Sequence, residues 1–408
     1  MFYYLYMWIA RHGWISALTP EGTMAGPLFR AALAVLVTFV LVLVGGGQVI
    51  RWLMRQKVGD NPEFHNKTLN ELTKHKGNTP TMGGVMIIGA ILITTLLVSD
   101  FLNFYVIMAV FCLVYLAVLG AIDDWLKLTT ARRTPGSRDG LLAWEKLVFQ
   151  IGLGTILALF IYWHAEKVGA ATAPVRTGTT LTMGDHRPAE SAAALANRTA
   201  NAVHAHQLNW PFLRQLVLPA WLFALLTILV ITGTSNAVNL TDGMDGLAAG
   251  CMALVSFAFM ALCYVTGDVR WASVAGLNSV QGTGELAVIC GAITGACLGF
   301  LWYNCNPAQV FMGDTGSLAL GGVMGYVAIV IRQEPMLLLV GGIFVLEAMS
   351  VMMQVSYFRM TGGKRIFLCS PIHHHFHLKG WSEQQVVVRF WLISALCAAF
   401  GLATVKLR

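Results

Sequence analysis

Long apolar runs alternate with short polar segments along almost the whole chain. We predict ten membrane-spanning helices from these runs, because a helix needs about 20 apolar residues to cross the hydrocarbon of a bilayer. Only "RQEP" separates the eighth and ninth runs, but its charges and Pro335 suit the start of a new helix. The predicted spans are approximately 28–50, 82–99, 102–122, 142–163, 214–233, 246–266, 285–303, 317–332, 335–357 and 386–404.

The composition indicates a polytopic membrane protein and excludes a soluble one. Of the 408 residues, 56% are hydrophobic and 12% are charged, whereas soluble domains carry about 25% charged residues. We therefore expect an all-α fold that forms a single integral membrane domain over residues 1–408. The eight cysteines contain no CxxC pair and lie mostly in apolar runs, which favours small buried hydrophobes over disulfides or a zinc site.

The distribution of lysine and arginine predicts the orientation of the spans. The loops after spans 1, 3 and 9 are basic, whereas those after spans 2, 6 and 8 carry almost no lysine or arginine. We therefore expect the odd-numbered loops on the cytoplasmic side and both termini on the periplasmic side. The loop after span 4, residues 164–213, is long and rich in alanine and threonine. We interpret it as a mobile periplasmic insert.

The polar motifs all fall in odd-numbered loops or at their edges. They are "HKGNTPTMGG", "GAIDDWLK", "NAVNLTDGMDGLA", "VFMGDTGSLAL" and "SPIHHHFHLKGW", whereas the even-numbered loops contain no comparable Asp–Gly cluster. We therefore expect a shared functional site at the cytoplasmic end of the bundle. Its candidate residues are Lys76, Asp123, Asp124, Asp242, Asp245, Asp314, His373, His374 and His375.

Three even-numbered spans begin at this end with capping sequences, "TPTMGG", "TDGMDG" and "GDTGS". A helix N-terminus carries free N–H groups and partial positive charge, which favour phosphate; plain capping is the alternative. The nearby carboxylates would repel a phosphate unless a cation lay between them. Magnesium binds one or two carboxylates together with water and phosphate oxygens, which favours metal-assisted phosphoryl transfer. Calcium or manganese would accept the same ligands.

Two further features concern spans 9 and 10. Neighbouring residues of a helix point about 100° apart, so the histidines of "HHHFH" are interpreted as phosphate donors or proton carriers rather than as one metal site. Glu347 lies inside span 9, seven residues before Gln354 and on the same helical face. An ionisable residue inside a span is a functional candidate, with helix-to-helix hydrogen bonding as the alternative. Gln354 lies nearer the cytoplasmic end and is the stronger site candidate.

The motifs "TPTMGG", "DDWLK", "NAVNLTDGMDGLA", "NPAQVFMGDTGSLALGG" and "PIHHHFHLKGW" together resemble the phospho-N-acetylmuramoyl-pentapeptide transferase family. This family is a branch of the polyprenyl-phosphate N-acetylhexosamine-1-phosphate transferase superfamily, and the resemblance covers nearly the whole chain. It implies a multi-pass enzyme of the bacterial inner membrane that serves peptidoglycan biosynthesis, and with it cell shape and division. The implied reaction transfers phospho-N-acetylmuramoyl-pentapeptide from its UDP-linked donor to undecaprenyl phosphate and releases UMP. Mg²⁺ is the implied cofactor, a homodimer is an expectation, and no nucleic acid is involved.

The resemblance also implies roles for single residues. Asp123 and Asp124 would lie near the lipid phosphate, Asp314 would bind magnesium, and His373 completes the expected catalytic set. The family pattern has one residue between the lysine and the glycine before "TPT", whereas Gly77 directly follows Lys76 here, which leaves the role of Lys76 open. The expected substrate-binding set is Lys76, Thr81, Lys127, Asn236, Asn239, Asp242, Asp245, Phe311 near the uracil, Ser317, Gln354, His374 and His375.

The chemistry of the implied acceptor favours one mechanism. A lipid phosphate is already mostly anionic at neutral pH, since its second pKa is about 6, so it needs positioning and charge neutralisation more than a strong base. We therefore favour direct attack on the β-phosphate, with Asp123 orienting the acceptor or taking its proton. A two-step route through an aspartyl-phosphate on Asp314 is the alternative.

Two other functions compete with this interpretation. A sister-branch enzyme would transfer a different UDP-N-acetylhexosamine phosphate. A proton-coupled transporter would also use buried acids and histidines, but such sites usually lie at midplane in broken helices between inverted repeats. Here the acids cluster at helix ends and no internal repeat is visible, which favours the enzyme.

Overall fold

The structure is a computed structural model, described for residues 3–4, 26–56, 79–130, 140–172, 207–208 and 216–405. In these ranges it is almost entirely helical, as predicted, and its single sheet pairs β1 (Gln207–Leu208) with β2 (Leu216–Val217) antiparallel. The main helices are α2 (Pro27–Arg55), α4 (Gly84–Val98), α5 (Phe104–Thr130), α6 (Ala143–Thr172), α8 (Ala220–Thr241), α9 (Leu247–Gly267), α10 (Val269–Ala275), α11 (Gly284–Asn304), α12 (Gly313–Val330), α13 (Glu334–Val340), α14 (Gly342–Met360), α15 (Ile372–Leu378) and α16 (Glu383–Thr404).

Each of the ten predicted spans corresponds to a helix or to a pair of helices in the described ranges. Eight described helices are long and apolar enough to cross a membrane, and the pair α13–α14 would make a ninth span. Helix α4 has only 15 residues, about 22 Å of helix, because the chain before it enters the bundle in a non-helical conformation. The predicted all-α membrane architecture is therefore confirmed, while the sidedness of the bundle stays a prediction.

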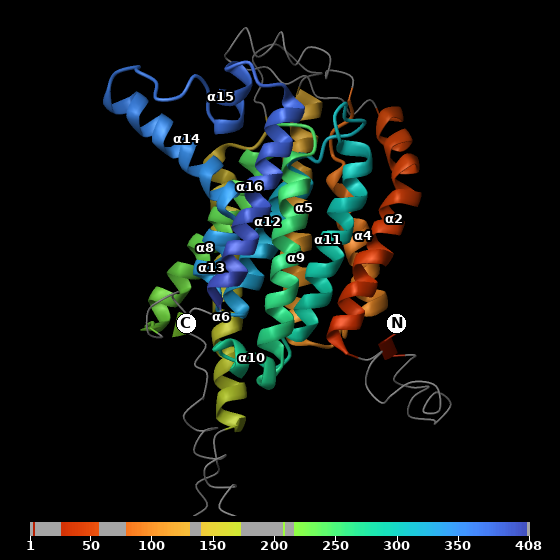
Figure 1. The fold of residues 1–408 in the computed structure, drawn as a ribbon, viewed down its shortest axis with the longest axis vertical. Helices are drawn as coiled ribbons and strands as arrows, with labels where there is room; N and C mark the ends of the chain where they lie inside the picture. Colours follow the sequence, from red (N-terminus) through yellow and green to blue (C-terminus); the bar gives the residue numbers. More distant parts are fainter. Residues whose placement is uncertain are drawn as a thin grey trace, which may run out of the picture.

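The predicted ninth span is not one straight helix. The break before it is confirmed, since α12 ends at Val330 and α13 begins at Glu334. A second break, not predicted, follows at Gly341 and Gly342, where α13 and α14 meet at 86°. Adjacent glycines weaken a helix at this point because they lose the most backbone entropy on ordering. Figure 1 shows α14 leaving the bundle obliquely as a result.

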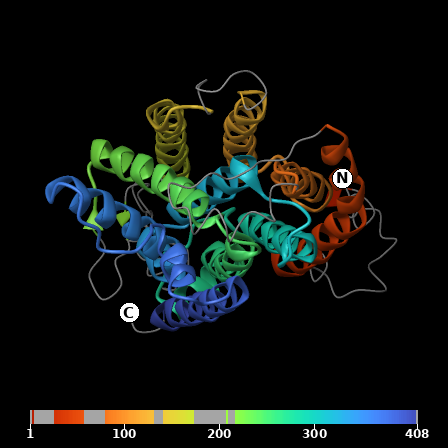
Figure 2. The same ribbon diagram turned by 90° about the horizontal axis from the view of Figure 1, so that it is seen from above.

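Helices α11 and α12 form the interior of the bundle (Figure 2). Nearly every residue of α12 is buried, and α11 is buried over most of its length. Glycines let these helices approach their neighbours closely: a Cβ on Gly295 would lie only 2.1 Å from the Val35 carbonyl oxygen of α2. Such small-residue contacts drive helix association where lipid offers no hydrophobic advantage. Helix α12 is thus held firmly from several sides.

Several helix ends meet at the upper end of the bundle in Figure 1. Helices α5 and α8 end there, α6, α9 and α12 begin there, and α15 lies close by, whereas α2 begins and α16 ends at the opposite end. The predicted gathering of the polar motifs at one end is therefore present in the structure. Lys76 and most of the predicted insert at 164–213 lie outside the described residues.

Candidate active site

Two buried aspartates from different helices share two lysines at this end of the bundle. The Lys146 ammonium of α6 lies 2.7 Å from Asp123 Oδ2 of α5 and 2.5 Å from Asp314 Oδ2 of α12. Lys127, one turn after Asp123, lies 2.8 Å from the same Asp123 oxygen and 3.3 Å from Asp314 Oδ2. The remaining oxygens accept hydrogen bonds from the Leu141 backbone N–H and the Asn239 side-chain amide. We call Asp123, Asp314, Lys127 and Lys146 the ion-pair cluster.

Asp124 lies beside this cluster and caps α12. Its Oδ1 accepts the backbone N–H of Asp314 at 3.1 Å, and its Oδ2 accepts the backbone N–H and the hydroxyl of Thr315 at 3.0 and 2.7 Å. A carboxylate suits this place because the first N–H groups of a helix have no partner within it and carry partial positive charge. Asp124 therefore fixes the start of α12, and with it the backbone of Asp314.

Glycines allow the three chain segments to approach one another here. A Cβ on Gly120, one turn before Asp124, would lie 2.2 Å from the Asp314 carbonyl oxygen. Gly313 has a φ of +71°, and a Cβ on it would lie 2.7 Å from Asp124 Oδ2 and 3.1 Å from Thr81 Oγ1. The positive φ and the lack of space both require glycine. Thr81 is thereby placed beside the start of α12.

The predicted substrate ligands at and near the "TDGMDG" turn, between α8 and α9, have different surroundings. Asn239 reaches the cluster, because its side-chain amide donates to Asp314 Oδ1 at 2.7 Å and to Ser317 Oγ at 3.0 Å. Asp245 instead braces the segment after α11, where its Oδ2 accepts the Asn306 amide and the Ala308 backbone N–H at 3.0 Å. Asp242 is partly buried at the end of α8.

The electrostatic surroundings of Asp242 alter its proton affinity. Burial and the nearby charges of Asp314 and Asp124 raise the pKa of its carboxyl well above the usual range, while the Gly313 backbone N–H opposes this effect. A raised pKa means that Asp242 releases its proton less readily than a solvated aspartate. This fits a residue that lies beside other acids.

The predicted residues of α14 and α15 lie on the other side of the same turn. A Cβ on Gly243 would lie 2.5 Å from His373 Nε2 and 3.4 Å from His374 Nε2, so both rings abut the turn. His375 points elsewhere and accepts the Leu368 backbone N–H at its Nδ1. Burial and then Lys379 lower the pKa of His375. The three histidines therefore do not face one point: the rings of His373 and His374 lie 4.1 Å apart beside the turn, and His375 faces away from them.

Gln354 and Asn236 have contacts within the protein. Gln354 Oε1 accepts the backbone N–H groups of Ile366 and Phe367 at 3.0 Å, so it holds the segment that follows α14. Asn236 donates to Gln150 Oε1 on α6 at 2.7 Å and lies in the contact between α6 and α8. The partly buried Phe311 donates its backbone N–H to Pro80.

The helix N-termini that were candidates for phosphate binding are occupied by protein groups. At α4, Gly83 N and Gly84 N donate to the carbonyls of Phe311 and Met312 at 2.7 and 2.8 Å. At α9, Gly246 N donates to Asn304 Oδ1, and at α12 Asp124 takes the first N–H groups. For these groups the structure supports plain capping, the alternative interpretation. The positive charge at this end comes from the lysines.

Lys146 was not among the predicted site residues. It contributes to the basic third loop, but the sequence gives no reason to prefer it over the other basic residues there. The structure places it in the first turn of α6, facing α5 and α12. Thr315, which bonds Asp124, was missed for the same reason, since its partner lies 191 positions away.

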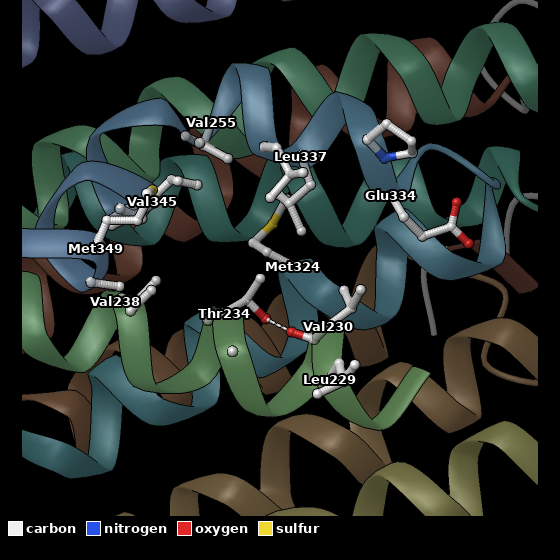
Figure 3. Close-up of a pocket in the computed structure, with 18 of the residues that line it drawn as sticks. Leu229, Val230, Thr234, Val238, Val255, Met324, Glu334, Leu337, Val345 and Met349 are labelled. Atoms are coloured by element: carbon white, nitrogen blue, oxygen red, sulfur yellow. Dashed lines mark hydrogen bonds between the residues drawn. The ribbon is translucent and has the colours of Figure 1, made fainter. Parts of the chain in front are cut away.

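An apolar groove lies next to the bent pair α13–α14 (Figure 3). It has a volume of about 290 Å³ and is lined by α8, α9, α12, α13 and α14. Its Thr234 hydroxyl is satisfied by the Val230 carbonyl of its own helix (Figure 3). Leu229 and Met352 on its walls are 60% and 61% exposed, so the groove can admit a lipid chain from the side.

Comparison with known proteins places this geometry in a family. Residues 105–332, which include the ion-pair cluster and the "TDGMDG" turn, match the family described as glycosyl transferase family 4. The chain belongs to glycosyl transferase family 4. Proteins with similar sequences come from several bacteria, and each of those compared is named phospho-N-acetylmuramoyl-pentapeptide-transferase.

Three of these relatives show how far the similarity extends. The protein of Desulfotalea psychrophila is 41% identical over 93% of both chains. That of Thermodesulfovibrio yellowstonii is 40% identical over 93% of this chain and 94% of its own. That of a Caulobacter species is 38% identical over the full length of both. The chain is therefore a glycosyl-1-phosphate transferase and a multi-pass protein of a bacterial membrane.

The carboxylates of this family member could hold a metal ion. Asp123, Asp124 and Asp314 each offer an oxygen, and these oxygens lie within 4.8 Å of one another. Three buried carboxylates against two ammonium groups leave one net negative charge in the resting site. Oxygen ligands with a negative balance suit a hard divalent cation such as magnesium.

Proposed function

We propose that this protein transfers phospho-N-acetylmuramoyl-pentapeptide from its UDP-linked donor to undecaprenyl phosphate, releasing UMP, in peptidoglycan precursor synthesis. The names of the full-length relatives support the transferred group. The observation that carries the reaction class is the ion-pair cluster at one end of a membrane bundle. Two lysines and clustered carboxylates are the groups that phosphoryl transfer requires, since its catalysis rests on positioning and charge stabilisation.

The apolar groove supports a lipid acceptor. It is lined by α8 and α14, the helices that carry Asn239 and Gln354 near their C-terminal ends, and it has exposed apolar walls. A polyprenyl chain would lie in this groove, because its walls are mostly apolar and Glu334 is the one ionisable group among the described residues of the lining. Its phosphate would then reach the ion-pair cluster.

The two neighbouring aspartates would have different roles. Asp124 has three protein hydrogen bonds at the start of α12 and would keep Asp314 in place. Asp123 shares Oδ2 with Lys127 and Lys146, so an entering phosphate would compete for the same ammonium groups. We therefore assign to Asp123 the orientation of the acceptor phosphate, or acceptance of its proton, and to the two lysines the neutralisation of its charge.

Magnesium would be held by Asp314, with Asp123 as the second carboxylate. When bound, magnesium neutralises charge on the phosphates and lowers the cost of bringing two anions together. Asn239 bonds Asp314 Oδ1 at 2.7 Å, which would set the direction of the carboxylate. Direct attack by the acceptor phosphate on the β-phosphate of the donor remains the favoured route, because a lipid phosphate is already mostly anionic at neutral pH and needs charge neutralisation more than a strong base.

The donor would lie across the "TDGMDG" turn. We assign the nucleotide side of the site to Asn239, Asp242 and Phe311. Thr81 and Ser317, near the start of α12, are assigned to the same side. His373 and His374 abut Gly243 from the opposite side and would contact the donor's phosphates or sugar. Five further residues stay predicted substrate ligands: Lys76, Asn236, Asp245, Gln354 and His375. The last four of them have protein partners in the structure.

UMP release tests this function. Purified protein in detergent is supplied with UDP-N-acetylmuramoyl-pentapeptide and undecaprenyl phosphate, with and without Mg²⁺. We expect Mg²⁺-dependent UMP release, and loss of about 100-fold or more in Asp314→Asn, as when a charge-stabilising group is removed. Asp268→Asn is the matched control, because this carboxylate is solvated and caps the short helix α10 at the other end. Release with UDP-N-acetylglucosamine alone would assign the chain to the sister branch.

A further inference from the structure

Glu347 and His373 form a buried pair of ionisable groups that the proposed chemistry leaves unexplained. Glu347 lies in α14 and His373 in α15, and both side chains are fully buried. Glu347 Oε2 lies 3.1 Å from His373 Nδ1. Among the described residues, neither side chain makes a hydrogen bond with good geometry.

Burying a carboxylate without a partner costs several kcal/mol of folding free energy. This cost is comparable to the whole free energy of unfolding of a typical protein. Among the described residues, His373 is the one basic group within ion-pair distance of Glu347. The distance already allows a hydrogen bond, so a small rotation of the ring completes it. An ionised Glu347 therefore gains a hydrogen bond from this pair only if His373 carries a proton on Nδ1.

The other nitrogen of the ring faces the site. A Cβ on Gly243 would lie 2.5 Å from His373 Nε2 and 2.9 Å from Cε1. The Nδ1 edge of the ring thus meets Glu347, while the Nε2 edge meets the "TDGMDG" turn. The ring of His374 lies 4.1 Å away, centroid to centroid, and limits the tilt of His373 on its own helix.

We propose that Glu347 is a positioning residue, which holds His373 with Nδ1 protonated and so presents Nε2 to the donor side of the active site. The partner of one ring nitrogen decides which nitrogen carries the proton in a neutral imidazole. With Nδ1–H directed at Glu347, Nε2 can accept a proton, or donate to a phosphate oxygen once the ring is protonated. The seven-residue spacing from Glu347 to Gln354 places both on the face of α14 that packs toward α15. This inference rests on the proposed function only for what Nε2 contacts.

A double-mutant cycle tests the pair through turnover. Glu347→Gln keeps the size of the side chain and removes its charge. We expect kcat to fall about 10-fold to 100-fold, the usual cost of losing an orienting partner, while KM for the UDP-linked donor changes much less. In a His373→Ala background the same change should lower kcat less than about twofold, since non-additivity marks residues that act together. Ser350→Ala, one turn along α14 and also buried, is the control and should keep wild-type kcat.

A purely structural role would give a different result. If Glu347→Gln lowered kcat by the same factor with and without His373, or left wild-type kcat unchanged, the proposal would be wrong. Thermal unfolding of each variant in detergent shows whether a loss reflects unfolding, and Glu347→Asp should recover part of the activity that Glu347→Gln loses.

A second measurement needs neither turnover nor a folded variant at position 347. In ¹⁵N-histidine-labelled wild-type protein, the ring signals that disappear in His373→Ala belong to His373. We expect them to report Nδ1 protonated, and an Nε2-protonated ring would refute the pair. If the wild-type protein releases no UMP while this signature is present, the proposed function fails and the pairing stands.

Discussion

Gly120→Ala is expected to abolish most activity without touching any charged group. Gly120 lies one turn before the Asp123–Asp124 pair, and an added Cβ would lie 2.2 Å from the backbone oxygen of Asp314. Real Cβ contacts essentially never fall below 3.0 Å, so α5 and the start of α12 must separate by about 1 Å. A displacement of that size at a reacting centre costs about 100-fold in rate. Overpacking would also cost about 1–3 kcal/mol of stability.

The assay is UMP release at saturating donor and acceptor, together with thermal unfolding in the same detergent. Gly89→Ala is the matched control, because Gly89 lies in α4 and has no atom within 4 Å of its added Cβ. We expect wild-type kcat for Gly89→Ala and a loss of about 100-fold for Gly120→Ala. If folded Gly120→Ala kept kcat within about twofold of the wild type, close contact between α5 and α12 would not position the site, and the reasoning would be wrong.

Three further substitutions separate catalytic from structural contacts. Lys146→Met should lower kcat by about 100-fold, because the Lys146 ammonium joins Asp123 and Asp314. Substitution of the exposed Arg270 by Met should leave kcat at the wild-type value, and equal kcat in the two variants would refute the role of Lys146. Asp124→Asn should lower stability by about 0.5–2 kcal/mol in denaturant unfolding, since an amide cannot accept all three hydrogen bonds at the start of α12; unchanged stability would contradict the capping role. Asn236→Ala should lower stability by about 1 kcal/mol through its lost bond to Gln150; unchanged stability would contradict this role in the contact between α6 and α8, and a raised KM for the donor would show that Asn236 also binds substrate, as predicted.

The sequence predicts the helices well because the signal for each is local. Every apolar run is long enough to be recognised alone, and the short "RQEP" break was visible from charge and proline. The bend at Gly341–Gly342 was missed because two glycines inside an apolar run are common in membrane helices that stay straight. The direction of α14 after the bend brings it against α8, α15 and α16, and no local pattern records these contacts.

The site was predictable as a region but not as a set of contacts. Neighbouring helical residues must diverge by about 100°, so the sequence already required different surroundings for Asp123 and Asp124. It could not say which of the two would cap α12, because that depends on how α5 packs against α12. Lys146 shows the same limit, since its two carboxylate partners come from α5 and α12 and lie 23 and 168 positions away.

The origin of the positive charge at the site illustrates why packing matters for the mechanism. Capping sequences at three helix starts suggested that backbone N–H groups would receive phosphate. The structure instead gives these groups to Asp124, Asn304 and the carbonyls of Phe311 and Met312. Among the groups described around the cluster, Lys127 and Lys146 then remain as the cations between two carboxylates. A phosphate entering the site must therefore exchange partners with these lysines, and a divalent cation that takes over the carboxylates would release both ammonium groups to it.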